Sequence, residues 1–224
     1  MEKFKVDYGE QSDFKGIRIL FDFLEEGLAY ARNNNIKEVC VWNSTNNTRQ
    51  TIDFSFLEKN QSLKVFHWLV PLSKKSNIEG LYGLNNLLNL RWSADCDFAI
   101  DLSKISSLEI LNVGISHKLF TNWESLSCLK ELYIQSIQAN DCIFLSGLKK
   151  LEKLRIINGN FSSLSGLDKL NNLNDLSLIK CSKLKNLNPL PPNKSLLRLR
   201  IEKCKNLMVS KPELEVFAKH IVFL

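Results

Sequence analysis

The leucines of residues 145–160, LSGLKKLEKLRIINGN, change their spacing partway along the segment. Up to Leu154 the apolar side chains follow one another at intervals of three residues, and Ile156 then follows at an interval of two. An interval of three suits a tight helical turn or irregular coil, whereas an interval of two places alternate side chains on opposite faces of a β-strand. The pattern therefore predicts that the segment changes from coil to strand at Leu154.

The same pattern, L-x-x-L-x-L with apolar substitutes, recurs eight times along the chain. Its first positions are Ile36, Leu63, Leu87, Leu108, Leu129, Leu151, Leu173 and Leu196. Successive copies are separated by 27, 24, 21, 21, 22, 22 and 23 residues. A unit of this length cannot bury its apolar edge alone, and it therefore stacks against its neighbours. Each copy is expected to add one strand to a parallel sheet.

The L-x-x-L-x-L motif at a period near 22 resembles that of leucine-rich repeat proteins over residues 36–208. The additional leucines before the motifs are most similar to those of the short bacterial repeat of the internalin type. The resemblance implies an α/β solenoid, a leucine-rich repeat horseshoe with about eight parallel strands, an N-terminal helical cap and a C-terminal cap. The chain departs from the family pattern at the ninth repeat position, which is usually asparagine. The residues there are Asp95, Ser116, Ile137, Gly159, Cys181 and Cys204. No continuous asparagine ladder is therefore expected.

Segments on either side of the repeats are predicted to close the open ends of the stack. Residues 1–35 form the predicted N-terminal cap, with a helix in FDFLEEGLAYARNNN and a capping box between Asp22 and Glu25. Residues 209–224 form the predicted C-terminal cap, with a short helix opened by Pro212 and a strand-like IVFL end. With both caps present, the whole chain is expected to be one complete structural domain.

Composition narrows the class of protein further. The 224 residues carry 30 basic and 24 acidic side chains, a net charge of +6 that permits an acidic protein partner or a weak nucleic-acid contact. No apolar run reaches the roughly 18 residues of a membrane helix, and MEKFKVDYGE lacks the apolar stretch of a secretory signal. The protein is therefore expected to be cytoplasmic and to have no membrane contact.

The reactive side chains form no recognisable catalytic or metal-binding motif. The six cysteines show no metal-ligand spacing and are expected to be free thiols, with Cys181 and Cys204 stacked in adjacent repeats. No H-E-x-x-H, G-x-S-x-G or glycine-rich phosphate loop is present. Cys40 and His67 share one position in neighbouring repeats and could form a nucleophilic pair, although a register slip there would separate them. No catalytic residue, metal ion or small-molecule cofactor is expected, and the chain is predicted not to be an enzyme.

The third, fifth and seventh positions of each motif are expected to point away from the core, onto the concave face of the sheet. Arginine and large aromatic side chains on that face would be typical of a binding surface, because they dominate the energetics of protein interfaces. The predicted partner-binding residues are Trp42, His67, Leu69, Arg91, Asn112, Tyr133, Arg155, Ile157 and Arg200. Apolar side chains are also expected to be exposed there and to need a cover. They are Val65, Leu69, Ile110, Ile157 and Ile179.

These features favour a protein-binding module that acts by binding alone. The leading hypothesis is a bacterial inhibitor or immunity protein that neutralises a toxin, so that the partner is a protein such as a toxin domain. An adaptor or scaffold protein is the first alternative, and a nucleic-acid binder that uses a basic stripe in the last repeats is the second. The stripe consists of Lys153, Arg155, Lys180, Arg198, Arg200 and Lys203. Nucleic acid is the less favoured partner, since Tyr133 is the one aromatic residue placed beside the stripe for base stacking.

Overall fold

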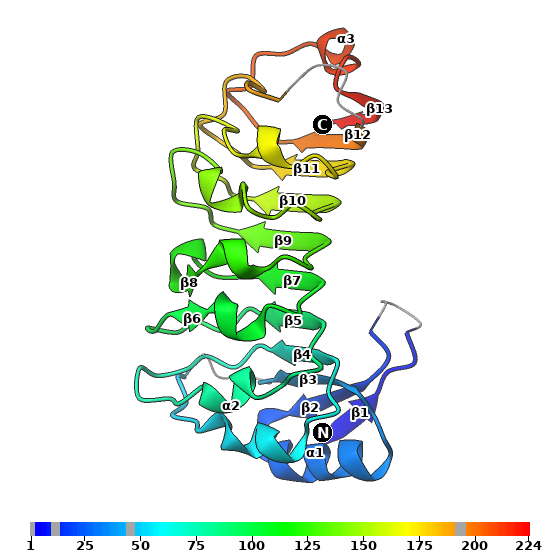
Figure 1. The fold of residues 1–224 in the computed structure, drawn as a ribbon, viewed down its shortest axis with the longest axis vertical. Coiled ribbons are helices and arrows are strands. Elements are labelled where there is room, and N and C mark those ends of the chain that lie inside the picture. The colour runs from blue at the N-terminus through cyan, green and yellow to red at the C-terminus, as the bar shows by residue number, and fades with distance from the viewer. Residues whose placement is uncertain (1–2, 10–13, 44–47, 191–195) are drawn as a thin grey trace. The chain divides into compact units, whose positions relative to one another are not determined.

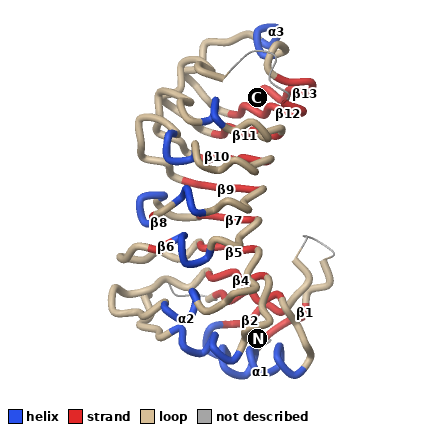
Figure 2. Tube along the Cα trace, viewed as in Figure 1, coloured by secondary structure: helices blue, strands red, loops and turns tan. Residues whose placement is uncertain are grey.

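The computed structural model describes residues 3–9, 14–43, 48–190 and 196–224. The chain forms two compact units, Met1–Phe98 and Ala99–Leu224. In each unit, parallel strands alternate with loops and short helical turns that lead the chain from the end of one strand to the start of the next (Figure 1, Figure 2).

The sheet of the first unit begins before the first predicted repeat. Its strands, in spatial order, are β1 (Phe4–Val6), β2 (Ile17–Leu20), β3 (Glu38–Trp42), β4 (Val65–Trp68) and β5 (Asn89–Trp92). β1 is antiparallel to β2, and the later neighbours are parallel. The connections contain η1 (Phe21–Phe23), α1 (Leu24–Asn33), η2 (Phe54–Lys59) and α2 (Glu79–Tyr82).

Aromatic side chains fill the core of the first unit. Phe54, Phe66, Trp68 and Trp92 are fully buried, and the ring centroids of Phe54 and Trp68 are 4.7 Å apart. Trp68 Nε1 donates a hydrogen bond to the Val70 carbonyl at 2.8 Å, so its polar atom is satisfied inside the core. Trp68 and Trp92 therefore belong to the core of this unit.

The second unit contains a longer run of parallel strands. They are β7 (Ile110–Val113), β9 (Glu131–Gln135), β10 (Lys153–Ile157), β11 (Asp175–Ile179), β12 (Leu196–Glu202) and β13 (Ala218–Phe223). A separate short pair joins β6 (Ile100–Asp101) to β8 (Phe120–Thr121). The connections contain η3 (Leu102–Ile105), η4 (His117–Leu119), η5 (Trp123–Ser125), η6 (Ile143–Leu145), η7 (Leu167–Lys169) and α3 (Lys211–Leu214).

Rows of leucine and isoleucine fill the core of the second unit. One such row consists of Leu111, Leu132, Leu154, Leu176 and Leu199, each at most 1% exposed. Strands β9 to β12 end in a common turn, in which Ser136, Asn158, Lys180 and Lys203 have φ angles of 55°, 56°, 54° and 55°. The backbone N–H of each turn residue donates to the next strand, as from Asn158 to the Ile179 carbonyl at 2.9 Å. This repeated left-handed turn keeps the register constant from strand to strand.

Cysteines occupy the ninth repeat position in the last two repeats. The backbone N–H of Cys181 donates to Cys204 Sγ at 3.4 Å, and Cys204 Sγ lies 3.5 Å from the Leu178 carbonyl oxygen. Both cysteines are free and buried, and their predicted stacking in adjacent repeats is confirmed. The Cys204 thiol therefore supplies a buried hydrogen-bond acceptor at a position where asparagine is usual in leucine-rich repeats.

The leucine-rich repeat fold with parallel strands, which the family resemblance implied, is confirmed. The eight predicted repeats coincide with β3, β4, β5, β7, β9, β10, β11 and β12. Two further parallel strands, β2 and β13, flank them. β2 lies in the segment predicted to be a helical cap, and its Ile17 and Ile19 align with Val39 and Val41, 22 residues later. The repeat thus begins one copy earlier than the motif search indicated.

The helix predicted in residues 21–35 is present as α1, but the capping box predicted at its start is wrong. Asp22 lies in the 3-10 turn η1, and neither η1 nor α1 has a side-chain cap at its first residue. A capping interaction instead precedes α3, where Glu213 Oε2 accepts hydrogen bonds from Ser210 N at 2.6 Å and Ser210 Oγ at 2.7 Å. The helix that contains Pro212 and the final strand are present as predicted. Among the described residues, none of the helices combines the length and apolar character needed to cross a bilayer.

Candidate functional site

The register of the second unit aligns equivalent repeat positions in straight rows across the strands. The third-position row consists of Ile110, Glu131, Lys153, Asp175, Arg198 and His220. The fifth-position row consists of Asn112, Tyr133, Arg155, Ser177, Arg200 and Val222. Neighbouring strands are about 4.8 Å apart, so adjacent members of a row are close enough to interact.

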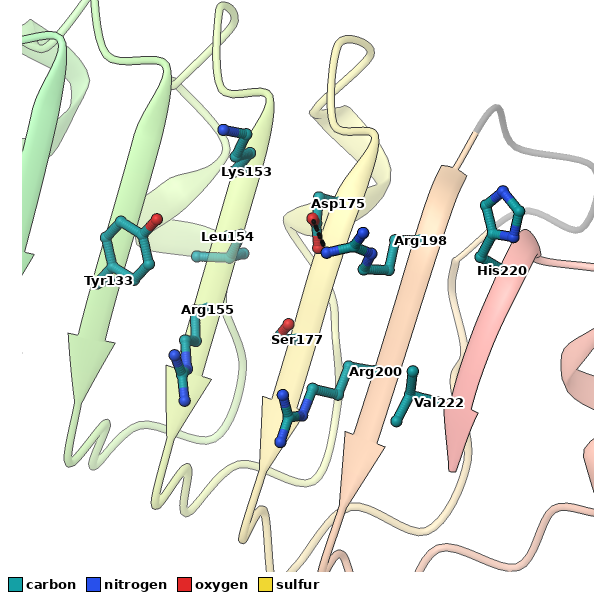
Figure 3. Close-up of a pocket in the computed structure, with 10 residues that line it drawn as sticks. All are labelled: Tyr133, Lys153, Leu154, Arg155, Asp175, Ser177, Arg198, Arg200, His220 and Val222. Carbon is teal, nitrogen blue, oxygen red and sulfur yellow. Dashed lines mark ion pairs between the residues drawn. The ribbon is translucent and has the colours of Figure 1, made fainter. Parts of the chain in front are cut away.

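A shallow hollow of about 480 Å³ lies on this face, over strands β9 to β13. Figure 3 shows Tyr133, Arg155 and Arg200 on the open side of the strands. Arg155 extends toward the C-terminal end of β10, and Arg200 reaches from β12 across the C-terminal part of β11. Ser177 lies between these arginines in the row. The hollow therefore presents guanidinium and hydroxyl groups on a rigid sheet, an arrangement that can bind anionic or planar polar groups.

The third-position row alternates in charge and largely neutralises itself. Lys153 Nζ lies 2.7 Å from Glu131 Oε1, and this hydrogen bond raises the pKa of Lys153. Arg198 Nη1 lies 3.7 Å from Asp175 Oδ2, the ion pair marked in Figure 3. These acid–base pairs leave little uncompensated charge along this row.

The fifth-position row is basic and contains no acidic residue. Arg200 Nη2 contacts Glu202 Oε2 at 2.6 Å, and the Arg200 guanidinium holds the pKa of the Glu202 carboxyl below its usual range. The Tyr133 hydroxyl donates to Glu131 Oε2 at 3.1 Å, and burial, followed by Glu131, raises the Tyr133 pKa. Tyr133 therefore stays neutral with its ring fixed against the sheet. Arg155 is exposed and makes no hydrogen bond or ion pair within the described part of the chain.

The equivalent fifth-position row in the first unit consists of Arg18, Cys40, His67 and Arg91. Phe14 packs over part of it, with its ring centroid 5.3 Å from that of His67 and 5.0 Å from Arg18 Cζ. Arg18 is held there by Asp7, whose Oδ2 lies 2.8 Å from Arg18 Nη2. Phe14 is 7% exposed and Cys40 only 3%. The chain thus closes this part of its own strand face.

This closure opposes the nucleophilic pair considered for Cys40 and His67. Burial raises the pKa of the Cys40 thiol, whereas an activated thiolate needs a lowered one. Burial, assisted by the positive charge of Arg91, lowers the pKa of His67 to about 4. Both groups are therefore held in their neutral forms near pH 7, so neither supports an activated thiolate at Cys40.

The predicted partner-binding residues divide between the two units. In the second unit, Tyr133, Arg155 and Arg200 line the hollow, and Asn112 and Ile157 are half-buried on the strands β7 and β10. In the first unit, Trp42 is 37% exposed, Arg91 is exposed, Leu69 is half-buried, and His67 is half-buried beside Phe14.

The expected stripe of exposed apolar side chains is absent. Ile179 is buried at 5% exposure, and the other four residues of that set, Val65, Leu69, Ile110 and Ile157, are only half-buried. Neighbours in the same row cover such side chains from both sides, and long polar side chains cover them further. Cys40, which was also expected to face outward, is buried. These apolar side chains therefore do not require a partner to shield them from water, and they give no support to the hypothesis of a bound partner.

Sequence reasoning missed the contribution of β13 to the hollow. His220 aligns with Arg198 and Val222 with Arg200, each 22 residues later. The repeat period itself could have found them, because the interval equals that between the earlier repeats. Extending the motif by one imperfect copy would have placed both residues on the same face.

The described residues contain no group of three or more histidine, cysteine or acidic side chains that could hold a metal ion. No protein-family model and no curated protein matches the chain. Among solved structures it is similar to an internalin (inlF) from Listeria monocytogenes, with a TM-score of 0.56 and 17% sequence identity over 88% of this chain. It spans 64% of the length of that internalin. An internalin C2 (inlC2) from the same species gives a TM-score of 0.45 at 19% identity, covering 89% of this chain and 84% of that one. The first likeness and the strand register together show that the chain has the leucine-rich repeat fold of the internalins.

Proposed function

We propose that the chain is a protein-binding module and that it binds its partner with the β9–β13 hollow. The observation that supports this most is the openness of the hollow: Arg155 is exposed and unpaired within the described part of the chain, on a sheet that holds Tyr133 and Arg200 in fixed positions. Arginine and tyrosine are the residue types that most often dominate binding energy. A preformed strand face also loses little conformational entropy when it binds.

The size of the face indicates how much of the molecule takes part. Six strands at about 4.8 Å spacing, each about 17 Å long, give a face of about 24 Å by 17 Å. A stable interface buries roughly 800 Å² on each partner. The strand face alone supplies about half of this area, so the loops at the strand ends are also part of the proposed contact.

Within this class we favour an inhibitor, such as a bacterial immunity protein that occupies a toxin domain in the cytoplasm. The reason is that inhibition by binding needs no catalytic group, because a rigid preformed surface can block another protein by covering it. A scaffold or adaptor would use the same surface. The two are distinguished by whether the purified partner loses its activity when the complex forms.

The test requires a purified partner, first isolated by affinity capture and then measured by isothermal titration calorimetry. Ser177→Trp places a large ring at the centre of the hollow, on a half-buried side chain that points away from the core. We expect the dissociation constant to rise at least about thirtyfold, the effect of losing one strong contact of about 2 kcal/mol. Gln138→Trp, at an exposed position in the loop after β9, is the matched control and should bind like the wild type. Equal affinity of Ser177→Trp and the wild type would place the binding surface elsewhere.

A further inference from the structure

Three of the four lysine and arginine side chains that line the hollow are already matched by acids of the chain itself. Glu131 pairs with Lys153, Asp175 with Arg198, and Glu202 with Arg200. Arg155 is the fourth, and its neighbours in the fifth-position row are the uncharged Tyr133 and Ser177. One guanidinium therefore remains to be matched by something outside the described chain.

The carboxylate of Glu202 cannot serve Arg155 as well. Its Oε2 contacts Arg200 at 2.6 Å, and its Oε1 lies 3.8 Å from Lys203 Nζ. Arg200 and Lys203 thus already share this one carboxylate, and Arg155 lies two strands away from it, on β10. The positive charge of Arg155 is therefore left over, and the local charge excess is positive.

The single excess positive charge of Arg155 limits the kind of anion that fits the hollow. A phosphate dianion or a nucleic-acid backbone needs several free cations, because each neutralised phosphate uses about one of them. Here the third-position row is already neutralised, and a single arginine is free. One carboxylate matches one guanidinium in charge, and its two oxygens match the planar pair of N–H donors.

The groups beside Arg155 suit the same ligand. Ser177 stands between Arg155 and Arg200 in the row, so its hydroxyl can donate to a carboxylate held by Arg155. Tyr133 lies on the other side and offers a ring face, while its hydroxyl proton is engaged by Glu131 at 3.1 Å. The apolar part of a glutamate or aspartate side chain can pack against this ring as its carboxylate meets Arg155.

We infer that Arg155 is the anchor for an aspartate or glutamate side chain in an acidic segment of the partner protein. The inference rests on the proposed function, because it names the chemical feature that the same hollow recognises. It assigns nucleic acid no role at this surface.

Binding of two fluorescein-labelled probes, measured by fluorescence anisotropy on the full chain, tests the inference. One probe is an oligoglutamate peptide and the other a single-stranded oligothymidylate of matched charge. We expect the peptide to bind the wild type, and Arg155→Gln to weaken this binding at least about tenfold, the usual effect of losing one hydrogen-bonded charge pair. Lys150→Gln removes an exposed cation from the loop before β10, outside the hollow, and it should change the affinity by less than about twofold.

The outcomes separate this inference from the proposed function. Peptide binding that is absent, or equal in Arg155→Gln and the wild type, overturns the anchor. Tighter binding of oligothymidylate, with an affinity that falls steeply as salt is added, also overturns it and favours a nucleic-acid contact. If Ser177→Trp abolishes binding of the purified partner while Arg155→Gln does not, the proposed surface stands and the anchor fails. Circular dichroism melting of Arg155→Gln and Lys150→Gln should match the wild type, since both side chains are exposed and Arg155 holds no other described residue in place.

Discussion

The fifth position of the repeat has opposite surroundings in the two units. In the first unit Phe14 packs over the row at Arg18 and His67, and Cys40 beneath is buried. In the second unit the equivalent row carries Arg155 on an open face beside the hollow. The register of the strands is the same in both cases. A repeat therefore determines where a side chain is placed, while segments outside the motif determine whether it is available to a partner.

The electrostatic consequences differ in the same way. Burial under Phe14 favours neutral forms, as the lowered pKa of His67 shows. On the open face of the second unit, charged side chains remain charged and pair across neighbouring strands, as Lys153 does with Glu131. The first-unit row is therefore covered by the chain itself around Cys40 and His67, and the second-unit row is a solvated surface with one cation left over.

Replacement of the covering ring should show the largest difference between the units. Phe14→Ala removes a buried aromatic side chain and exposes the row beneath, and we expect it to lower the free energy of unfolding by about 3 kcal/mol. Tyr133→Ala, at a half-buried ring on the open face, should lower it by only about 1 kcal/mol. Urea denaturation followed by circular dichroism measures both. Equal losses would show that Phe14 does not close the face of the first unit.

The second-largest effect is expected in the pH dependence of stability, through His67 in the covered row of the first unit. The folded-state pKa of His67 is about 4 and its ordinary value 6.5, so the unfolded chain binds a proton that the folded chain excludes between these values. Stability should therefore fall as the pH is lowered from 6.5 to about 4. Each pKa unit corresponds to about 1.4 kcal/mol, and allowing for the partial exposure of the ring we expect a loss of about 2 kcal/mol.

His67→Gln should remove this part of the pH dependence, measured as the difference between its unfolding free energies and those of the wild type across the window. The charges that face His67 in its row are Arg18 and Arg91, and both oppose its protonation. His220→Gln, at an exposed position in β13, is the control. A wild-type pH profile in His67→Gln would contradict the closure of this row.

The placement of side chains in rows across the strands could be predicted from the sequence, because the repeat period permits a single register between neighbouring strands. Spacings of 21 to 23 residues place Tyr133, Arg155 and Arg200 in one row, and the structure has them there. The isolation of Arg155 follows from the same alignment, since its row neighbours are tyrosine and serine. The pairing of Lys153 with Glu131 could have been predicted in the same way.

The covering of the first unit could not be predicted from the motif. Phe14 precedes the predicted repeats, and its contact with His67 depends on the path of the chain between β1 and β2. The burial of Ile179 at 5% exposure was also unpredictable, because alternation along the strand assigns its position to the outer face. A pattern within one repeat contains no information on contacts such as that of Phe14 with His67, which join different segments of the chain.

Thiol reactivity sharpens the comparison at a single repeat position. Ser177→Cys introduces a thiol into the open row at the position that Cys40 occupies in the first unit. Because Cys40 is buried and its pKa is raised, we expect it to react with iodoacetamide at least about tenfold more slowly than Cys at position 177 near pH 7.5. Peptide mapping by mass spectrometry resolves the two sites in one sample. Comparable rates would mean that the two rows are equally accessible.

The smallest effect is expected from the ion pairs of the open face. Glu131→Gln removes the charge that pairs with Lys153 at 2.7 Å, where both side chains are partly exposed. Such pairs contribute at most about 0.5 kcal/mol, because solvent screens the charges and the side chains lose rotamer freedom. Stability in urea should therefore stay close to that of the wild type, while the hollow gains a second unmatched cation and should bind the oligoglutamate peptide about twofold more tightly. A loss of stability above about 2 kcal/mol would contradict this prediction. It would show that Glu131 and Lys153 contribute to the folded core and do not belong to a solvated surface.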